Sequence, residues 1–378
     1  MTTARPLSGV TILEIGHSIA APFAGMILGE LGAEVIKVEQ PGTGDYCRDW
    51  GPPFWDGAAA TFQAINRAKR GITVDLKDAR QLAELRRFIV ERVDVVLQNL
   101  RFGVLDKAGL SGATLVGEKP GLIYCNLGAF GAKGPLRDRP GYDPLMQAHG
   151  GLMSLLGEDG RPPVRVGVSI VDLSTGMWAA IGVLAALQER SRTGQGGVVD
   201  TSLYEAALNW MAIPIAMYLC NGQLPRREGS GTAQIVPYQA FHTRDGWIMV
   251  LAGNDGLFRR LCEALGCTEL AADERFRING NRVVHRATLI PMLQEILARS
   301  PTAFWRAKLD ALGVPNGPIQ TVDQVVEDPQ TQALEMIQTS PDGVLRLVGM
   351  PLCFDGMRPP FERRAPALGE HNDEILGG

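Results

Sequence analysis

Asp172 is a carboxylate that stands shortly before an apolar run, a position from which an acidic side chain can do chemistry. The run extends from Met177 to Leu187 and ends at the polar Gln188-Glu189-Arg190, so it predicts a buried helix. A carboxylate at a helix start accepts hydrogen bonds from unpaired backbone N–H groups and lies at the positive end of the helix dipole. We therefore expect Asp172 to stay ionised near neutral pH, which makes it a usable nucleophile. Helix capping by Asp172 or Ser174 explains the same residues without any chemistry.

Other groups that commonly do chemistry are scattered along the chain. The six cysteines include no CxxC pair and the five histidines show no metal-ligand spacing, so we expect reduced core thiols and no metal site. The net charge of −4 gives no general attraction to nucleic acid or to an anionic membrane. Eleven apolar residues are too few to cross a bilayer, which needs ~20, and the first residues lack the apolar stretch of a signal peptide. We therefore expect a cytoplasmic protein without nucleic-acid or membrane partners.

The elements that must position Asp172 alternate in a pattern typical of an α/β fold. A length of 378 residues favours two domains. Short β-rich runs alternate with helix-length segments, which indicates βαβ units and a parallel sheet that binds ligands at the carboxyl ends of its strands. We expect strands at 10–15, 34–38, 72–76, 95–97 and 122–127, and helices at 20–31 and 79–90.

The first strand-to-helix turn, Gly16 to Pro22, lacks the GxGxxG spacing that admits a dinucleotide, which disfavours a nicotinamide dehydrogenase. Past Asp200 the pattern changes to a helix at 202–219, a turn-rich linker at 221–231, and a hairpin of 240–243 with 247–251. We therefore expect a large domain beginning at 1–200, a helix and linker at 201–228, a small domain at 229–315, and a return segment at 316–378 that completes the large domain.

Several motifs together resemble the family III CoA-transferases, a family that includes formyl-CoA transferase, the carnitine CoA-transferases and the α-methylacyl-CoA racemases. The resemblance extends over nearly the whole chain. The motifs that carry it are Pro6-Leu7-Ser8-Gly9-Val10, the segment 31–39, Asn66-Arg67-Ala68-Lys69-Arg70, the segments 72–77 and 99–105, Gly141-Tyr142-Asp143, the segment around Asp172, and Arg192-Thr193-Gly194-Gln195-Gly196.

The resemblance implies a fold and a mechanism. The fold is a Rossmann-like large domain with a parallel sheet, built from both ends of the chain, plus a smaller α+β domain, and two chains interlock as a homodimer. The nucleophile is Asp172, which attacks an acyl-CoA to give a mixed anhydride and CoA thiolate. The thiolate then forms an aspartyl-CoA thioester, and an acceptor acid takes the CoA through a second anhydride. Each attack creates an oxyanion that needs backbone donors.

The racemase branch of the family is an alternative, because it moves a proton at the α-carbon with a histidine and an aspartate. In this chain Tyr142 stands at the histidine position, and a phenol with an ordinary pKa of ~10 is a poor base at neutral pH. The transferase is therefore favoured over the racemase or isomerase. A CoA-binding protein without activity is the other alternative. Asp143, beside Tyr142, either orients a polar group or builds a turn.

The resemblance also implies which residues bind CoA. Lys77, Arg101 and Lys107 supply positive charge for its phosphates. Gln40 stands where some relatives carry an arginine that contacts CoA. The full set of implied CoA-binding residues is Ile19, Ala20, Val74, Asp75, Leu76, Lys77, Asn99, Leu100, Arg101, Lys107, Pro140, Gly141, Tyr142 and Asp143.

Within the family, the segments 44–54 and 235–246 are most similar to the succinate–hydroxymethylglutarate CoA-transferase branch, which implies dicarboxylic acids as donor and acceptor and succinyl-CoA as the donor. A second carboxylate favours an arginine partner, for which Arg48 and Arg165 are candidates, although each can form a structural salt bridge instead. Relatives close the site with a glycine-containing loop. Gly229 and Gly231 belong to the nearest such segment here, which as a pattern also fits a flexible turn.

Overall fold

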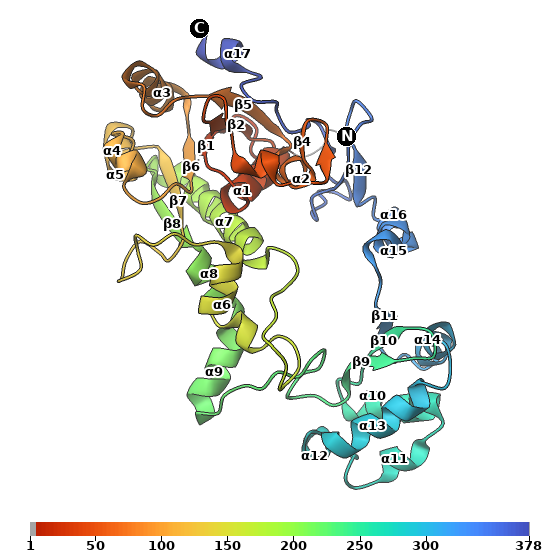
Figure 1. The fold of residues 1–378 in the computed structure, drawn as a ribbon. Helices are drawn as coiled ribbons and strands as arrows, with labels where there is room; N and C mark the ends of the chain where they lie inside the picture. Colours follow the sequence, from red (N-terminus) through yellow and green to blue (C-terminus); the bar gives the residue numbers. More distant parts are fainter. Residues whose placement is uncertain (1–4, 378) are drawn as a thin grey trace. The chain divides into compact units, whose positions relative to one another are not determined.

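The computed structural model describes residues 5–377. They form two compact units (Figure 1). The large unit comprises 5–152, Val166–Ala212 and 328–377, and the small unit comprises Met153–Arg165 and Ile213–Glu327. The expected small domain, 229–315, falls inside the small unit, while residues 1–4 and 378 of the expected large domain lie outside the described residues.

The large unit is built on a six-stranded parallel sheet with the order β5-β2-β1-β6-β7-β8. When these six strands are numbered in the order in which they occur along the chain, the sheet order is 3-2-1-4-5-6, which is the order of doubly wound nucleotide-binding folds. The expected parallel α/β sheet is therefore confirmed. The strands are β1 (Thr11–Ile15), β2 (Glu34–Glu39), β5 (Lys69–Thr73), β6 (Val95–Gln98), β7 (Ile123–Gly128) and β8 (Gly197–Ser202). The carboxyl ends of all six meet at one edge, because the strands are parallel.

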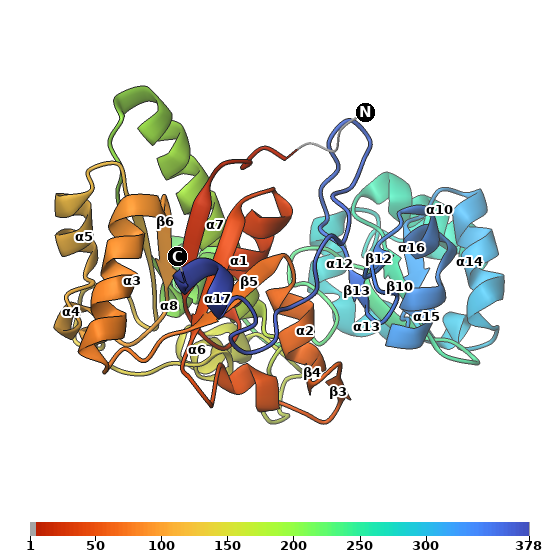
Figure 2. The ribbon, with the colours of Figure 1, turned by 90° about the horizontal axis from the view of Figure 1, so that it is seen from above.

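Helices cover both faces of this sheet, as Figure 2 shows. On one face, α3, α4, α5 and α17 enclose a core with alternate strand residues such as Leu13, Ile36 and Val96. On the other face, α1 packs against α7, and α7 packs against β7 and β8. The helices of this unit are α1 (Ala20–Glu30), α2 (Ala60–Asn66), α3 (Ala79–Arg92), α4 (Val104–Lys107), α5 (Gly112–Glu118), α6 (Asp143–His149), α7 (Ile170–Thr193), α8 (Leu203–Trp210), α16 (Pro329–Ala333) and α17 (Asn372–Leu376).

The helix after Asp172 is longer than its apolar run suggests. It spans the 24 residues of α7, so the argument that eleven residues exclude a membrane span is wrong. By length and composition α7 is able to cross a membrane, and so is the bent pair α8 and α9 (Ala212–Asn221) taken together. In the large unit, one side of α7 packs against α1, β7 and β8, and 39% of its apolar 18-residue window is buried. A Cβ at Gly176 would lie 2.7 Å from the Ala20 carbonyl oxygen, so this glycine lets the first turns of α7 and α1 approach.

The small unit has its own core. A three-stranded antiparallel sheet, in the order β11-β10-β9, packs with helices around Phe241, Phe258 and Phe276. Its elements are β9 (Tyr238–His242), β10 (Trp247–Leu251), α10 (Asp255–Leu265), α11 (Thr268–Ala272), α12 (Asn279–Val284), α13 (Arg286–Leu297), α14 (Thr302–Ala311), β11 (Asn316–Pro318) and α15 (Val322–Glu327). The predicted hairpin is present as β9 and β10.

Two predicted elements differ from the structure. The helix at 202–219 breaks at Met211 into α8 and α9, which are bent by 61°. The strand at 72–76 lies three residues too late, because β5 ends at Thr73. Beyond it, the Asp75 side chain accepts a hydrogen bond from the Lys77 N–H (2.9 Å), which makes the segment a turn. Residues 74–77 therefore form the loop at the carboxyl end of β5.

Candidate active site

A cavity of about 150 Å³ lies in the large unit at the carboxyl ends of β1, β6 and β7, and Asp172 lines it. In the strand order, β1 and β6 flank the switch point at which open α/β sheets bind their ligands. A larger cavity of about 930 Å³ lies against Arg5, Arg70 and Arg363, and it contains none of the predicted site residues. The smaller cavity, which holds the candidate nucleophile, is therefore the candidate active site.

Asp172 lies in the first turn of α7, but it does not cap the helix. The N-cap residue is Ser169, and its side chain makes no capping hydrogen bond. The carboxylate of Asp143 caps the helix from α6 instead, since its Oδ2 accepts from the N–H of Val171 (2.7 Å) and from the N–H of Asp172 (3.3 Å). The Ser174 hydroxyl donates to the Val171 carbonyl (3.1 Å). The capping alternative for Asp172 and Ser174 is therefore wrong.

Burial, together with the negative charge of Asp143, raises the pKa of Asp172 to about 7. The expectation that Asp172 is fully ionised near neutral pH is thus wrong, because the N–H donors of the helix start bind Asp143. Within residues 5–377, no hydrogen bond to the Asp172 carboxylate is present. A carboxylate that titrates near pH 7 in a cavity wall is a candidate for nucleophilic or general-base chemistry.

Asp143 is held in place by Gln147, one turn along α6. Both side chains are buried, with exposed fractions of 2% and 0%. The Gln147 amide donates to Asp143 Oδ1 (2.6 Å), and its oxygen accepts from the Val166 N–H (2.8 Å). This arrangement joins α6 to the segment that enters α7. It therefore sets the position of the first turn of α7 and of Asp172 within it.

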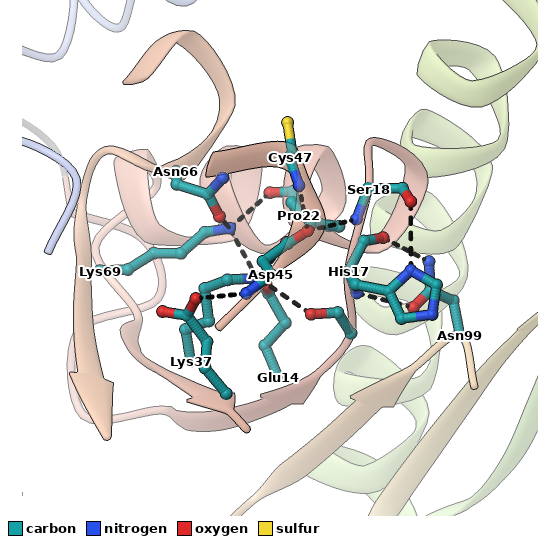
Figure 3. Close-up of polar contacts among 12 residues, drawn as sticks. Glu14, His17, Ser18, Pro22, Lys37, Asp45, Cys47, Asn66, Lys69 and Asn99 are labelled. Carbon is teal, nitrogen blue, oxygen red and sulfur yellow. Dashed lines mark hydrogen bonds and ion pairs between the residues drawn. The ribbon is translucent and has the colours of Figure 1, made fainter. Parts of the chain in front are cut away.

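A second buried group fixes the turn between β1 and α1 (Figure 3), and His17 and Ser18 of this turn line the cavity. Lys37 Nζ lies 3.0 Å from Asp45 Oδ2 and donates to the Gly16 carbonyl (2.9 Å). The other carboxylate oxygen, Asp45 Oδ1, accepts from the N–H of Ser18 (2.9 Å) and of Cys47 (3.0 Å). The turn is thus attached to the Lys37–Asp45 ion pair at two points.

Ser18 has a φ of 66°, a left-handed conformation that is uncommon for a residue other than glycine. Its neighbour His17 is held by Asn99 at the end of β6, which accepts from the His17 N–H (3.0 Å) and donates to its carbonyl (2.8 Å). The His17 ring packs on Tyr46 with centroids 4.9 Å apart. These contacts hold an uncommon backbone geometry in the wall of the cavity that Asp172 also lines.

The charges beneath this turn are fully buried. Lys37 also bonds Glu14 (2.9 Å), whose second oxygen lies 2.8 Å from Lys69 Nζ. Burial opposes the charge on each lysine, yet Glu14 and Asp45 hold the pKa of Lys37 above its ordinary value. Burial lowers the pKa of Lys69 to about 8 in spite of Glu14. The Lys37–Asp45 pair is therefore charged at neutral pH and can act as a fixed support.

The structure brings together part of the predicted CoA-binding set. The residues that line the cavity with Asp172 are Ala20, Asn99, Leu100, Arg101, Pro140, Gly141 and Tyr142. Ile19 precedes Ala20 as the N-cap residue of α1, and Asp143 lies behind the wall. Val74, Asp75, Leu76 and Lys77 follow β5 at the far end of the same sheet edge, and Lys107 lies in α4. None of the last five lines the cavity.

Of the four predicted substrate residues, only Arg48 belongs to the same unit as Asp172, and it does not line the cavity. Arg48 donates to both oxygens of Glu39 (2.8 and 2.6 Å) and to the Pro366 carbonyl (3.0 Å), so its guanidinium is already paired. Arg165 belongs to the small unit, as do Gly229 and Gly231. Gly229 has a φ of 61°, and its N–H donates to the Gly157 carbonyl (3.0 Å), so it forms a turn inside that unit.

Sequence reasoning missed several residues that line the cavity. His17, Ser18 and Tyr46 come from the β1 turn and the segment that supports it, and Arg137 and Arg139 come from the long loop after β7. The position of this loop directly after a predicted parallel strand could have indicated these two arginines, because segments that follow parallel strands meet at the ligand-binding edge of the sheet. The arginines had no local motif that would have distinguished them from solvated surface residues.

Comparison with known proteins agrees with this geometry. The sequence profile of CoA-transferase family III matches residues 7–372. The chain is 38% identical to the succinate–glutarate CoA-transferase of Agrobacterium fabrum over 98% of this chain and 95% of that protein. It is 37% identical to the succinyl-CoA–D-citramalate CoA-transferase of Chloroflexus aurantiacus over 98% of this chain and 93% of that protein.

A solved structure supports the same assignment. The crystal structure of a CaiB/BaiF family protein from Brucella suis superposes with a TM-score of 0.89 at 40% identity, covering 100% of this chain and 99% of that one. Sequence and fold therefore agree from end to end, and the predicted family resemblance is confirmed. The chain belongs to CoA-transferase family III and is an enzyme of that class.

Proposed function

We propose that this enzyme transfers CoA from succinyl-CoA to a short dicarboxylic acid, with Asp172 as the covalent nucleophile. The observation that carries the proposal is the position of Asp172, a carboxylate that titrates near pH 7 in the wall of a cavity at the switch point of the sheet. Two relatives support it: the transferase of A. fabrum is named for succinate and glutarate, and that of C. aurantiacus for succinyl-CoA and D-citramalate.

The proposed reaction begins with attack of the ionised Asp172 on the thioester carbonyl. The C–S bond breaks, CoA leaves as a thiolate, and a mixed anhydride of Asp172 and succinate remains. The thiolate then attacks the aspartyl carbonyl and releases succinate, which gives an aspartyl-CoA thioester. The acceptor carboxylate attacks this thioester, and the thiolate finally attacks the acceptor carbonyl of the new anhydride. Asp172 is regenerated, and the energy of the thioester is retained throughout.

Each attack places negative charge on a carbonyl oxygen, which backbone donors can stabilise. Helix α1 begins at Ala20, which lines the cavity, and no side chain caps its first turn. We assign the N–H groups at this end of α1 as the donors in the large unit. The raised pKa of Asp172 also fits the role, because a more basic carboxylate is a stronger nucleophile once it is ionised.

The proposal includes a homodimer and a cytoplasmic location. Apolar side chains are exposed on α7 and α8, among them Trp178 (44%), Ile181 (52%) and Trp210 (51%). Exposed apolar groups of this size commonly mark an interface with another chain, which supports the homodimer. Sedimentation of the purified protein tests it, and a monomer at micromolar concentration would contradict it.

The test of the covalent mechanism is to trap the aspartyl intermediate. The protein is incubated with succinyl-CoA alone and then with hydroxylamine, and the peptide that contains Asp172 is examined by mass spectrometry for a hydroxamate. We expect modification in the wild type and none in Asp172→Asn. Asp138→Asn, which removes another carboxylate that lines the cavity, is the matched control and should keep the modification.

If succinyl-CoA binds but Asp172 stays unmodified, the proposed route is wrong. Exchange of the α-proton of an acyl-CoA with deuterated water, without acyl transfer, would then support the racemase or isomerase alternative. Binding of CoA with neither reaction would support the inactive CoA-binding alternative.

A further inference from the structure

Three arginines line the cavity that contains Asp172, and none of them is paired with a carboxylate among the residues that the structure describes. Arg101 follows β6, while Arg137 and Arg139 belong to the loop between β7 and α6. All three are exposed, and none makes a salt bridge within residues 5–377. By contrast, Arg48 is paired with Glu39, and Arg190 is paired with Asp94. The cavity therefore presents free guanidinium groups beside the candidate nucleophile.

Of the three arginines, Arg137 has the guanidinium that is best held in place to bind an anion. Its guanidinium lies over the Phe102 ring, 4.9 Å from the ring centroid, and Phe102 itself lines the cavity. Backbone hydrogen bonds from Arg137 to Gly134 (3.3 Å) and from Arg139 to Leu136 (3.0 Å) form successive turns that hold this part of the loop. Stacking on an aromatic face restricts the guanidinium without using its hydrogen-bond donors. Arg137 is thus prepared to bind an anion.

The size of the cavity indicates which part of the substrate it receives. A volume of about 150 Å³ suits a small acyl group and is well below the roughly 300–1,000 Å³ of sites that enclose larger ligands. The phosphates of CoA are separated from its thioester by the whole pantetheine arm. An anion that lies in this small cavity next to the reacting carbonyl is therefore part of the acyl group, although Arg101 and Arg137 also line a neighbouring cavity of about 390 Å³ that Asp172 does not line.

The charges of the wall also favour an anionic acyl group. The cavity is lined by the three arginines and by two carboxylates, those of Asp138 and Asp172, and the buried carboxylate of Asp143 lies beside Asp172. These charges balance when Asp172 is ionised, and one positive charge is in excess when Asp172 is acylated and neutral. The excess positive charge is therefore greatest in the covalent intermediates. A negatively charged group on the acyl chain compensates it.

We propose that Arg137 binds the distal carboxylate of the dicarboxylic acyl group, with Arg101 and Arg139 adding positive charge around it. This inference rests on the proposed function and adds to it the residue that selects dicarboxylic over monocarboxylic substrates. Arg137 takes the role for which Arg48 was a candidate, because the Arg48 guanidinium is already bound to Glu39 and to the Pro366 carbonyl. A planar guanidinium can bind a carboxylate with two parallel hydrogen bonds, which gives both affinity and direction.

The test compares two donors that differ only at the distal end of the acyl chain. Butyryl-CoA has a methyl group where succinyl-CoA has the carboxylate, and the CoA part is identical. For Arg137→Met we expect kcat/KM with succinyl-CoA to fall about ten- to hundredfold, the usual loss for a charged hydrogen bond. With butyryl-CoA we expect a change of less than about threefold. Arg137→Lys, which keeps the charge but not the planar fork, should fall between wild type and Arg137→Met.

Arg92→Met is the matched control, because Arg92 is also exposed and also lies over a phenylalanine, at 5.6 Å from the Phe88 ring centroid, away from the cavity. In Arg92→Met, kcat/KM with succinyl-CoA and with butyryl-CoA should both stay at the wild-type value. If Arg137→Met lowers kcat/KM equally with the two donors, the inference is wrong, because the guanidinium would then bind the CoA part that both donors share. An unchanged rate with succinyl-CoA would overturn it as well. If the wild type itself transfers CoA from no donor, the proposed function fails and the inference with it.

Discussion

Asp143 caps the helix that carries Asp172, so the two carboxylates meet at the start of α7. Asp143 Oδ2 accepts the N–H of Asp172 at 3.3 Å, while the charge of Asp143 adds to the burial that raises the pKa of Asp172 to about 7. One residue therefore positions the candidate nucleophile and also tunes its proton affinity. The consequence is a site whose activity should depend on pH within the physiological range.

The first prediction concerns this pH dependence. Asp172 must be ionised to attack, so the rate with succinyl-CoA should rise with pH through about 7. Asp143→Asn removes the neighbouring negative charge, so the pKa of Asp172 falls and the acid limb of kcat/KM moves to lower pH. The measurement is a pH–rate profile of both proteins. An acid limb that stays in place would show that Asp143 does not influence the titration of Asp172.

The free energy of unfolding should also depend on the ionisation of Asp172. A carboxyl group whose pKa is raised by folding destabilises the folded state when it ionises, so the penalty appears as pH rises from about 4 to about 7 and stays constant above. Asp172→Asn removes this penalty. At pH 8 the variant should be more stable than wild type by up to about 4 kcal/mol, because each unit of the pKa difference contributes about 1.4 kcal/mol, and the difference should vanish near pH 4. Denaturant unfolding at the two pH values measures it, and a difference independent of pH would contradict the raised pKa.

The Lys37–Asp45 pair should matter for substrate binding as well as for folding. Asp45→Asn keeps one oxygen for the Ser18 and Cys47 N–H groups but turns an amide toward Lys37. Breaking a buried ion pair costs about 3–5 kcal/mol, so the free energy of unfolding should fall. Because the Ser18 turn forms the cavity wall, we also expect KM for succinyl-CoA to rise about tenfold.

The control for this variant is Glu30→Gln, which breaks the buried ion pair of Glu30 with Arg67. Neither residue lines the cavity. Its unfolding free energy should fall by a similar amount while KM stays near the wild-type value. If both variants change KM equally, the Asp45 effect is a general loss of stability rather than a loss of the Ser18 turn.

The small unit depends on a buried arginine. Arg282 is fully buried and donates to the carbonyls of Val236 (2.6 Å) and Phe276 (2.9 Å) and to Asp255 (2.8 Å). Arg282→Met leaves these acceptors without a donor, and we expect a loss of about 3–5 kcal/mol. Hydrogen exchange of β9 and α10 measures this loss within the small unit. Arg277→Met, which breaks an exposed pair with Glu274, should change it by less than about 1 kcal/mol.

The elements near Asp172 show how far local sequence signals reach. Strands β1, β2, β6 and β7 and helices α1 and α3 begin and end within about two residues of their predicted bounds, because apolar periodicity and turn formers act locally. The start of α7 was predicted near Asp172, and it lies at Ile170. Its full length was not predicted, because the polar segment 188–193 continues the helix without apolar periodicity.

The amino-acid sequence by itself determined the α/β pattern, the family, and the choice of Asp172, since these follow from local periodicity and from motifs in a fixed order along the chain. Only the tertiary structure decided that Asp143 rather than Asp172 caps α7, that Arg48 is bound by Glu39, and that three arginines without a carboxylate partner line the cavity. These facts depend on groups that are distant in sequence: the pKa of Asp172 follows from its burial and from a charge 29 residues earlier in the chain. Burial and Coulomb interactions act through space, so they become defined only once the chain has folded.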